Sequence, residues 1–169
     1  MADAVPLSQR KYDYAFLAFF LVNLLFITYI VDLEQLTIPS MDGAWSYPAW
    51  PPRWAVDMNH AYGYAHDPLQ IARPVWWKMT IWIDALIFGP FYAAAIFAFI
   101  KGRNWIRIPA VFYSGLMSAN VTIILGEEFA GPSAAPDFPF VLALNLPWLL
   151  FPLLLAARMW RDEPFTKMG

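Results

Sequence analysis

The chain has 169 residues, of which 60% are hydrophobic and only 14% are charged. Because about a quarter of the residues in an average soluble domain are charged, this composition excludes an ordinary water-soluble protein and indicates an integral membrane protein. The formal net charge of −2, without any basic run, also argues against a nucleic-acid partner.

Four segments are long and apolar enough to cross a bilayer, which takes about 20 mostly apolar residues. The third segment is expected to open at Pro109, since proline favours the first turn of a helix. The sequence therefore predicts an all-α integral membrane fold, a bundle of four transmembrane helices in a single domain over residues 1–169. The predicted spans cover about residues 14–31, 75–100, 109–125 and 138–157.

The connection between the first two spans is about 40 residues long, and loops of that length are usually functional or disordered. Disordered segments are poor in aromatic residues, which indicates that this connection is ordered. We predict an aromatic cap at the membrane interface, over the non-cytoplasmic end of the bundle; the alternative is a flexible loop whose Trp side chains anchor in the headgroups. The prediction depends on Pro39, Trp45, Pro48, Trp50, Pro51, Pro52 and Trp54.

Lysine and arginine set the predicted orientation, because they concentrate on the cytoplasmic side of membrane proteins. With four spans, both termini and the connection between the second and third spans share one side. That side carries Arg10, Lys11, Lys101, Arg103, Arg107, Arg158, Arg161 and Lys167. The other side carries Arg53, Arg73 and Lys78. We therefore expect a multi-pass protein with both termini in the cytoplasm.

Each span carries one polar side chain that stands out. Asp84 has apolar neighbours on both sides and Asp32 ends the first span, while Asn120 and Asn145 lie inside the third and fourth. Polar groups at membrane depth are costly and usually face the bundle interior or a cavity. At about 1.5 Å per residue, all four fall in the outer half of the membrane, which predicts one polar site beneath the cap. The alternatives are that the Asn side chains only join helices and that Asp32 lies in water at the boundary.

The predicted site combines two carboxyl groups with an aromatic ring. Two carboxylates in a dry site cannot both ionise easily, so either Asp32 or Asp84 should hold a proton. Such a pair suits proton transfer, and it equally suits an amine. Trp148 lies one turn after Asn145 on the same helix face, where its ring would attract a cation.

The remaining polar residues are expected to have ordinary roles. Glu127 and Glu128 close the third span and are expected in water, Asn23 is expected to join helices, and His60 and His66 are expected to be solvated. Without cysteine or a metal-binding spacing of His and acidic residues, we predict no metal site. We also predict no cofactor, because no phosphate loop, dinucleotide fingerprint or nucleophile elbow is present.

Several motifs resemble a known family of membrane proteins. FIKGRNWIRIPAVFYS after the second span, DALIFGPF within it and HDPL in the long connection are similar to the sigma-2 receptor branch of the EXPERA family. NLPWLLFP and NVTIILGE, in the fourth and third spans, resemble instead the sterol Δ8–Δ7 isomerase (emopamil-binding protein) branch. The resemblance extends from about residue 17 to residue 157 and, over the whole chain, favours the sigma-2 receptor branch.

The resemblance implies roles for the predicted site. In the sigma-2 receptor branch, the acid matching Asp32 pairs with ligand amines, and the buried acid matching Asp84 shares a proton with it. In the isomerase branch, a catalytic Glu stands at the position of Asp32. Asn145 and Trp148 match an Asn and a Trp that lie against the sterol and its cationic intermediate in the isomerase branch. Asn120 stands where that branch has Asp.

This chain also departs from the isomerase branch. Thr28 occupies the position, one turn before the first acid, where that branch has His, and the second acid of that branch matches Ile81 rather than Asp84. Glu127 ends the NVTIILGE stretch that resembles the isomerase. We therefore predict Asp32 and Asp84 as catalytic residues. The predicted substrate-binding residues are Thr28, Asn120, Glu127, Asn145 and Trp148.

Three functions are compatible with this site. The first is a cofactor-free isomerase, in which the Asp pair protonates and deprotonates an alkene of a sterol-like or terpenoid lipid through a carbocation. The second is a non-catalytic protein that binds sterols or cationic amphiphiles in lipid transport or in the regulation of membrane proteins. The third is an assembly subunit whose polar residues only join helices. The N-x-x-W pattern favours the isomerase, whereas Thr28 in place of His favours the binder.

The expected partners follow from these functions. They are a membrane lipid and a sterol-like or terpenoid ligand, and we also consider cationic amphiphiles and a homodimer. In a eukaryote, the resemblance implies the endoplasmic reticulum.

Overall fold

The computed structural model describes residues 4–42 and 44–166, and the basic residue Lys167 lies outside this part. The described residues form helices and connecting segments, with one isolated bridge, between Ala4 and Thr166, in place of any β-sheet. The elements are η1 (Leu7–Gln9), α1 (Asp13–Val22), η2 (Asn23–Asp32), α2 (Leu33–Thr37), α3 (Arg53–Ala65), α4 (Pro68–Ala72), α5 (Val75–Ile83), η3 (Asp84–Phe88), α6 (Gly89–Lys101), η4 (Asn104–Ile106), α7 (Arg107–Ala130) and α8 (Phe138–Arg158).

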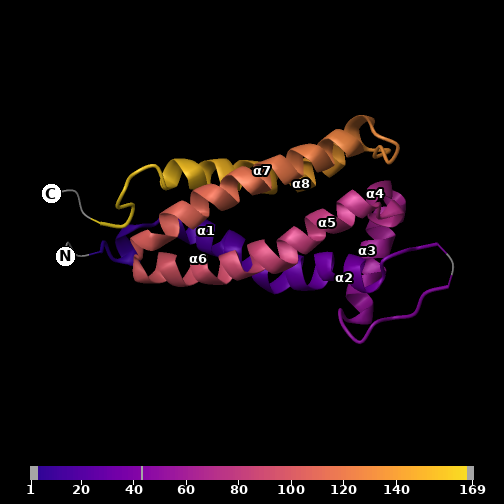
Figure 1. The fold of residues 1–169 in the computed structure, drawn as a ribbon, viewed down its shortest axis with the longest axis horizontal. Helices are drawn as coiled ribbons and strands as arrows, with labels where there is room; N and C mark the ends of the chain where they lie inside the picture. Colours follow the sequence, from indigo (N-terminus) through magenta and orange to yellow (C-terminus); the bar gives the residue numbers. More distant parts are fainter. Residues whose placement is uncertain (1–3, 43, 167–169) are drawn as a thin grey trace.

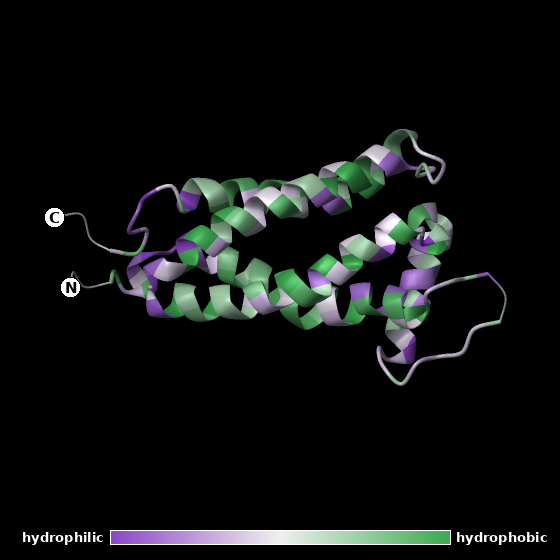
Figure 2. Cartoon of the chain, in the orientation of Figure 1, coloured by the Kyte–Doolittle hydropathy of each residue, from purple (hydrophilic) through white to green (hydrophobic). Residues whose placement is uncertain are grey.

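Four helical stretches are long and apolar enough to cross a membrane, which confirms the predicted four-helix membrane fold. They run from Asp13 to Thr37, Val75 to Lys101, Asn104 to Ala130 and Phe138 to Arg158, with mean hydropathies between 1.6 and 2.3. Hydrophilic residues gather at the two ends of the molecule, and the helices between them are mostly hydrophobic (Figure 2).

Two helices are longer than predicted. The first continues past Asp32 to Thr37, so Asp32 lies within the helix and not at its end. The extension remains helical because its polar residues, Glu34 and Gln35, are buried against the segments that follow. In the third span, α7 begins at Arg107, which makes Pro109 its third residue, and it continues to Ala130.

The helices form two antiparallel pairs that contact each other at one end of the bundle (Figure 1). The first pair joins α1, η2 and α2 to α5, η3 and α6, and the second joins α7 to α8. Both termini and the connection between α6 and α7 lie at the end where the pairs meet. Toward the opposite end the pairs diverge.

Aromatic packing closes the end of the bundle near the termini. The rings of Phe19 and Phe151 stack 4.6 Å apart, and the hydroxyls of Tyr92 and Tyr113 are 3.2 Å apart in the same core. The chain ends are tied to this core by Asp13, which accepts from Arg158 Nε at 2.9 Å. Side chains thus fill the core of this half, whereas the helix pairs diverge in the other half.

The second half of the predicted cap is helical, in α3 and α4, whereas residues 38–42 and 44–52, which hold most of its Pro and Trp residues, form no helix or strand. Its helices α3 and α4 lie across the diverging end of the first helix pair (Figure 1). A buried ionic cluster holds them there: Glu34 accepts from Arg73 Nη2 at 2.9 Å and lies 2.9 Å from His60 Nε2. Asn59 Nδ2 adds a contact of 3.3 Å to the same carboxylate. Removing one partner of such a buried pair typically costs about 3–5 kcal/mol, so the cluster fixes the cap to the first helix.

This cluster corrects the expectation that His60 is solvated. The His60 side chain is buried because α3 carries it onto the carboxylate of Glu34. His66, at the end of α3, instead packs its ring against Phe140 at 4.7 Å.

Candidate functional site

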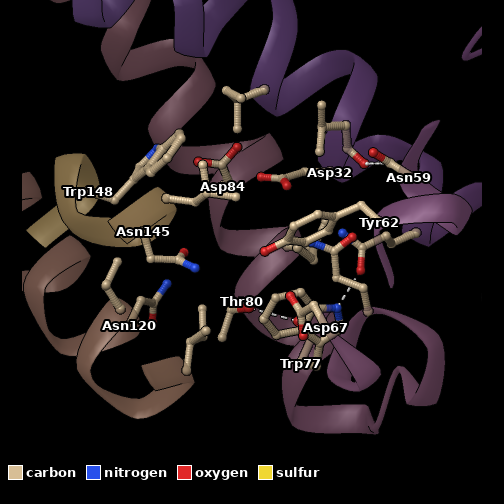
Figure 3. A pocket seen from close by; sticks show the side chains of 18 of the residues that line it. Asp32, Asn59, Tyr62, Asp67, Trp77, Thr80, Asp84, Asn120, Asn145 and Trp148 are labelled. Atoms are coloured by element: carbon tan, nitrogen blue, oxygen red, sulfur yellow. Dashed lines mark hydrogen bonds between the residues drawn. The ribbon is translucent and has the colours of Figure 1, made fainter. Parts of the chain in front are cut away.

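A cavity of about 500 Å³ lies between the diverging helix pairs, beneath the cap. All four spans and the cap contribute to its wall. The structure brings together most of the residues that the sequence singled out: Asp32, Asp84, Asn120, Asn145 and Trp148 all line this cavity (Figure 3).

Asp32 and Asp84 face each other across the cavity wall (Figure 3). Their carboxyl groups are close enough to share a hydrogen bond when one of them carries a proton. The Asp84 side chain is 7% exposed, and its Oδ2 has no donor among the described residues. An ionised carboxylate can only accept hydrogen bonds, whereas a protonated carboxyl group can donate one. A single proton on one of the two acids therefore allows a hydrogen bond between them. The pair can therefore present both a proton donor and a proton acceptor to a ligand.

Each acid adjoins a stretch of π-helix, in which backbone hydrogen bonds reach five residues back instead of four. Asp32 is the last residue of η2 and Asp84 the first of η3. Pro90, just after η3, has no N–H to donate, and Gly89 N donates to the carbonyl of Asp84. The freed carbonyl of Ala85 accepts instead from the Tyr29 hydroxyl, at 3.1 Å. Such π-segments are frequent at functional sites.

Side chains of the cap provide donors for the carbonyls of η2. Trp50 Nε1 donates to the carbonyl of Tyr29 and Asn59 Nδ2 to that of Val31, both at 2.7 Å. These contacts lie within one turn of Asp32, so the position of Asp32 depends on the packing of the cap against η2.

An amide–indole hydrogen bond positions the aromatic wall. Trp148 Nε1 donates to Asn23 Oδ1 at 2.7 Å, and Asn23 Nδ2 donates to the carbonyl of Phe19 at 2.8 Å. The indole therefore has one fixed orientation beside the cavity, and Asn23 joins α8 to the first helix, as the sequence suggested. Asn145 Nδ2 donates to the carbonyl of Val141 at 3.0 Å, within its own helix.

Two predicted binding residues do not line the cavity. Thr28 is fully buried beside Asp84, and Glu127 lies outside the cavity, where its Oε1 accepts from the backbone N–H of Ser133 at 2.9 Å. Glu127 thus stabilises the turn after α7. The expectation that it contacts a ligand has no support in this geometry.

Glu128 shows the opposite outcome, since it was expected in water and is instead 1% exposed at the cavity wall. Because α7 continues to Ala130, Glu128 follows the cavity-lining residues Val121 and Ile124 by seven and four positions. It therefore lies on the same helix face as they do, whereas Glu127 points about 100° away.

The sequence reasoning also missed the cavity residues of the cap and of α5. Asp67 accepts from the backbone N–H of Leu69 at 3.2 Å and so caps α4. Burial raises the pKa of Asp67, and the backbone N–H group of Leu69 opposes that shift. Trp77 Nε1 donates to Gln35 Oε1 at 2.6 Å. An Asp followed by Pro is a recognisable helix start, so the HDPL motif carried a signal for the cap.

The site belongs to a multi-pass membrane protein with an acid-lined cavity, and comparison with known proteins defines the family. The sequence profile of the EXPERA family (EXPanded EBP superfamily) matches residues 54–159, which extend from the second residue of α3 to just past the end of α8. The chain belongs to the EXPERA family, which confirms the resemblance seen in its motifs.

Curated relatives place the chain near one branch of this family. It is 31% identical to "Sigma intracellular receptor 2" of Xenopus tropicalis over 144 residues, which cover 79% of each chain. It is also 31% identical to the Homo sapiens protein of the same name over 114 residues, 60% of this chain and 64% of the relative. These similarities support the sigma-2 branch.

Gly89 is a position where the packing beside Asp84 can be tested. A Cβ at Gly89 would clash with the Tyr29 hydroxyl, whereas a Cβ at Gly115, on the exposed face of α7, would meet nothing within 4 Å. Gly89→Ala should therefore destabilise the protein by roughly 1–3 kcal/mol, as overpacking does. Gly115→Ala should be neutral or stabilise by up to about 1 kcal/mol.

The measurement is thermal unfolding of both variants in the same lipid nanodiscs. Equal effects of the two substitutions would show that the contact between Tyr29 and Gly89 does not hold the first two spans together.

Proposed function

We propose that the protein binds a sterol-like or terpenoid lipid in its cavity and moves a double bond of that lipid by acid–base catalysis. The observation that carries this proposal is the pair of facing carboxyl groups, Asp32 and Asp84, in the wall of an intramembrane cavity. Membership of the EXPERA family, with similarity to sigma intracellular receptor 2, supports a sterol-related membrane protein.

The reaction needs one proton donor and one acceptor. The protonated carboxyl group of the pair gives its proton to one alkene carbon, which forms a C–H bond and leaves a carbocation on the neighbouring carbon. The other group, a carboxylate, removes a proton from the adjacent carbon, and that electron pair forms the shifted double bond. The enzyme then holds one proton, as before, so the cycle needs no cofactor.

The rest of the cavity suits this intermediate. The carboxylate and the face of Trp148 would stabilise positive charge on the lipid, and Trp148 is held in place by Asn23. Asn120 and Asn145, which also line the cavity, would orient the lipid or the acids.

The lipid would enter from the bilayer, between the helix pairs. Leu144 and Met58 both line the cavity and are 45% and 41% exposed at its edge. Apolar residues that are shared by the cavity wall and the outer surface provide a path from lipid to Asp84 without passage through water.

A second candidate is a non-catalytic binder of sterols or cationic amphiphiles, active in lipid transport or in the regulation of membrane proteins. Thr28 favours it, because Thr28 lies beside Asp84 and stands where the isomerase branch has His. Similarity to a protein named as a receptor also favours it. An ammonium group would then take the place of the carbocation, against the same two carboxyl groups.

A conversion assay distinguishes the two candidates. Purified protein is given a Δ8-sterol in deuterated water, and the product is analysed by mass spectrometry, with Asp32→Asn, Asp84→Asn and the exposed control Asp57→Asn alongside. We expect a shifted double bond that carries deuterium, and a loss of at least about 100-fold in rate in the first two variants only, since each removes an acid–base group.

Absence of conversion, with sterol still bound and binding weakened in both site variants, would replace the isomerase by the binder. Unchanged conversion in Asp32→Asn and Asp84→Asn would contradict the role of the pair altogether.

We also propose that both termini face the cytoplasm and, in a eukaryote, that the membrane is the endoplasmic reticulum. The distribution of lysine and arginine supports this orientation, and the structure supports it by placing both termini at one end of the bundle.

Because the chain has no cysteine, a single Ser8→Cys or Ala134→Cys reports on one side only. In sealed vesicles with the cytoplasmic face outward, a membrane-impermeant maleimide should label position 8, and position 134 only after detergent; the reverse pattern would overturn the orientation.

A further inference from the structure

A second pair of carboxyl groups lies in the same cavity and takes no part in the reaction proposed above. Asp67, between α3 and α4, and Glu128, in the last turn of α7, both line the cavity and are 2% and 1% exposed. Figure 3 shows Asp67 beside Trp77 at the cap end, well apart from Asp84. The cavity therefore has acidic groups at two levels.

The cap end of the cavity contains several buried oxygen atoms whose hydrogen-bonding capacity is unused. Both carboxylate oxygens of Glu128 and the Oε1 atom of Gln70 are buried without a hydrogen-bond partner among the described residues. Gln70 also lines the cavity, and Asp67 has one oxygen engaged with the backbone N–H of Leu69. Each of these oxygen atoms can accept a hydrogen bond, and a buried polar atom left without a partner is costly. A ligand that brings a donor would remove that cost.

Tyr62 of α3 completes this end of the cavity. Burial, and then the negative charges of Asp67 and Glu128, raise the pKa of the Tyr62 hydroxyl. The phenol therefore keeps its proton, and it lines the cavity as a neutral polar group.

We infer that Asp67 and Glu128 form a second polar subsite, which binds the hydrogen-bond-donating head of the lipid, a hydroxyl or an ammonium group. This inference rests on the proposed function, because it requires a lipid in the cavity. The head would lie at the cap end, nearest the membrane interface where polar lipid groups lie, and the hydrocarbon body would reach Asp32 and Asp84. Head recognition would thus set the position of the lipid along the cavity.

A structural alternative makes a different prediction. The two carboxyl groups could share a proton only with each other and tie α4 to α7. Replacing Glu128 would then lower the stability of the protein without changing its choice among lipid heads.

The experiment compares three Δ8-sterols that differ only at the 3-position: a hydroxyl, an amine and a methyl ether, which accepts but cannot donate. Their binding is measured with the full chain in phosphatidylcholine nanodiscs. We expect the hydroxyl and amine to bind about tenfold more tightly than the ether, the change expected when a buried acceptor loses its donor. In Glu128→Met this preference should fall below about twofold, and in the matched control Glu127→Met it should stay.

A second variant separates the two donor heads. Glu128→Gln keeps an acceptor oxygen but loses the charge, so it should retain the preference for the hydroxyl and lose that for the amine. This variant keeps the size of the side chain and decides the question even if Glu128→Met does not fold.

Three results would overturn the subsite. Equal binding of hydroxyl and ether sterols to the wild type, with both weakened by Asp32→Asn, would refute it and leave the proposed function standing. If Glu128→Met still prefers the hydroxyl and amine sterols over the ether, the pair has a structural role only. If Glu128→Met does not fold, the same conclusion follows from a Glu128→Gln variant that still prefers the amine sterol. Failure of the wild type to bind any of the three sterols would refute the subsite together with the proposed function.

Discussion

Within a bilayer every backbone N–H and C=O group must find its partner inside the protein, because the hydrocarbon offers none. The two acids of this protein adjoin π-helical stretches where backbone pairing is irregular. Side chains provide the donors at these positions: the Tyr29 hydroxyl for the carbonyl of Ala85, and Trp50 and Asn59 for two carbonyls of η2. The geometry around Asp32 and Asp84 thus depends on contacts from a neighbouring span and from the cap.

The buried acids of the described residues divide into two kinds by their hydrogen-bond partners. Glu34 is fully partnered by Arg73, His60 and Asn59, and this cluster fixes the cap. Asp84 and Glu128, in contrast, are buried at the cavity wall, and oxygen atoms of both have no hydrogen-bond partner within residues 4–42 and 44–166. A folded protein does not gain stability from such groups. The proposed function gives such groups a role, in binding a ligand or transferring a proton.

Hydropathy and helix geometry predicted much of this arrangement from the sequence. Long apolar segments identified four spans, and counting residues from their ends placed polar groups of four helices at one depth, where they do line one cavity. Helix ends were less predictable, because α7 and the first span extend as far as neighbouring side chains can bury their polar residues. The longer α7 places Glu128, which was expected in water, at the cavity wall, and leaves Glu127 outside the cavity. The burial of His60 was also missed, since its partner Glu34 lies 26 positions away in the chain.

The central claim is that a lipid lies inside this cavity against the acid pair, and photoaffinity labelling tests it most directly. A Δ8-sterol with a diazirine on its ring system is activated in nanodiscs, and the labelled residues are mapped by mass spectrometry. The account predicts labels on cavity residues such as Ile81 and Trp148, which unlabelled sterol displaces and Asp84→Asn weakens. Labels confined to outer residues such as Leu25 and Ile108, which are 65% and 73% exposed, without displacement, would contradict it.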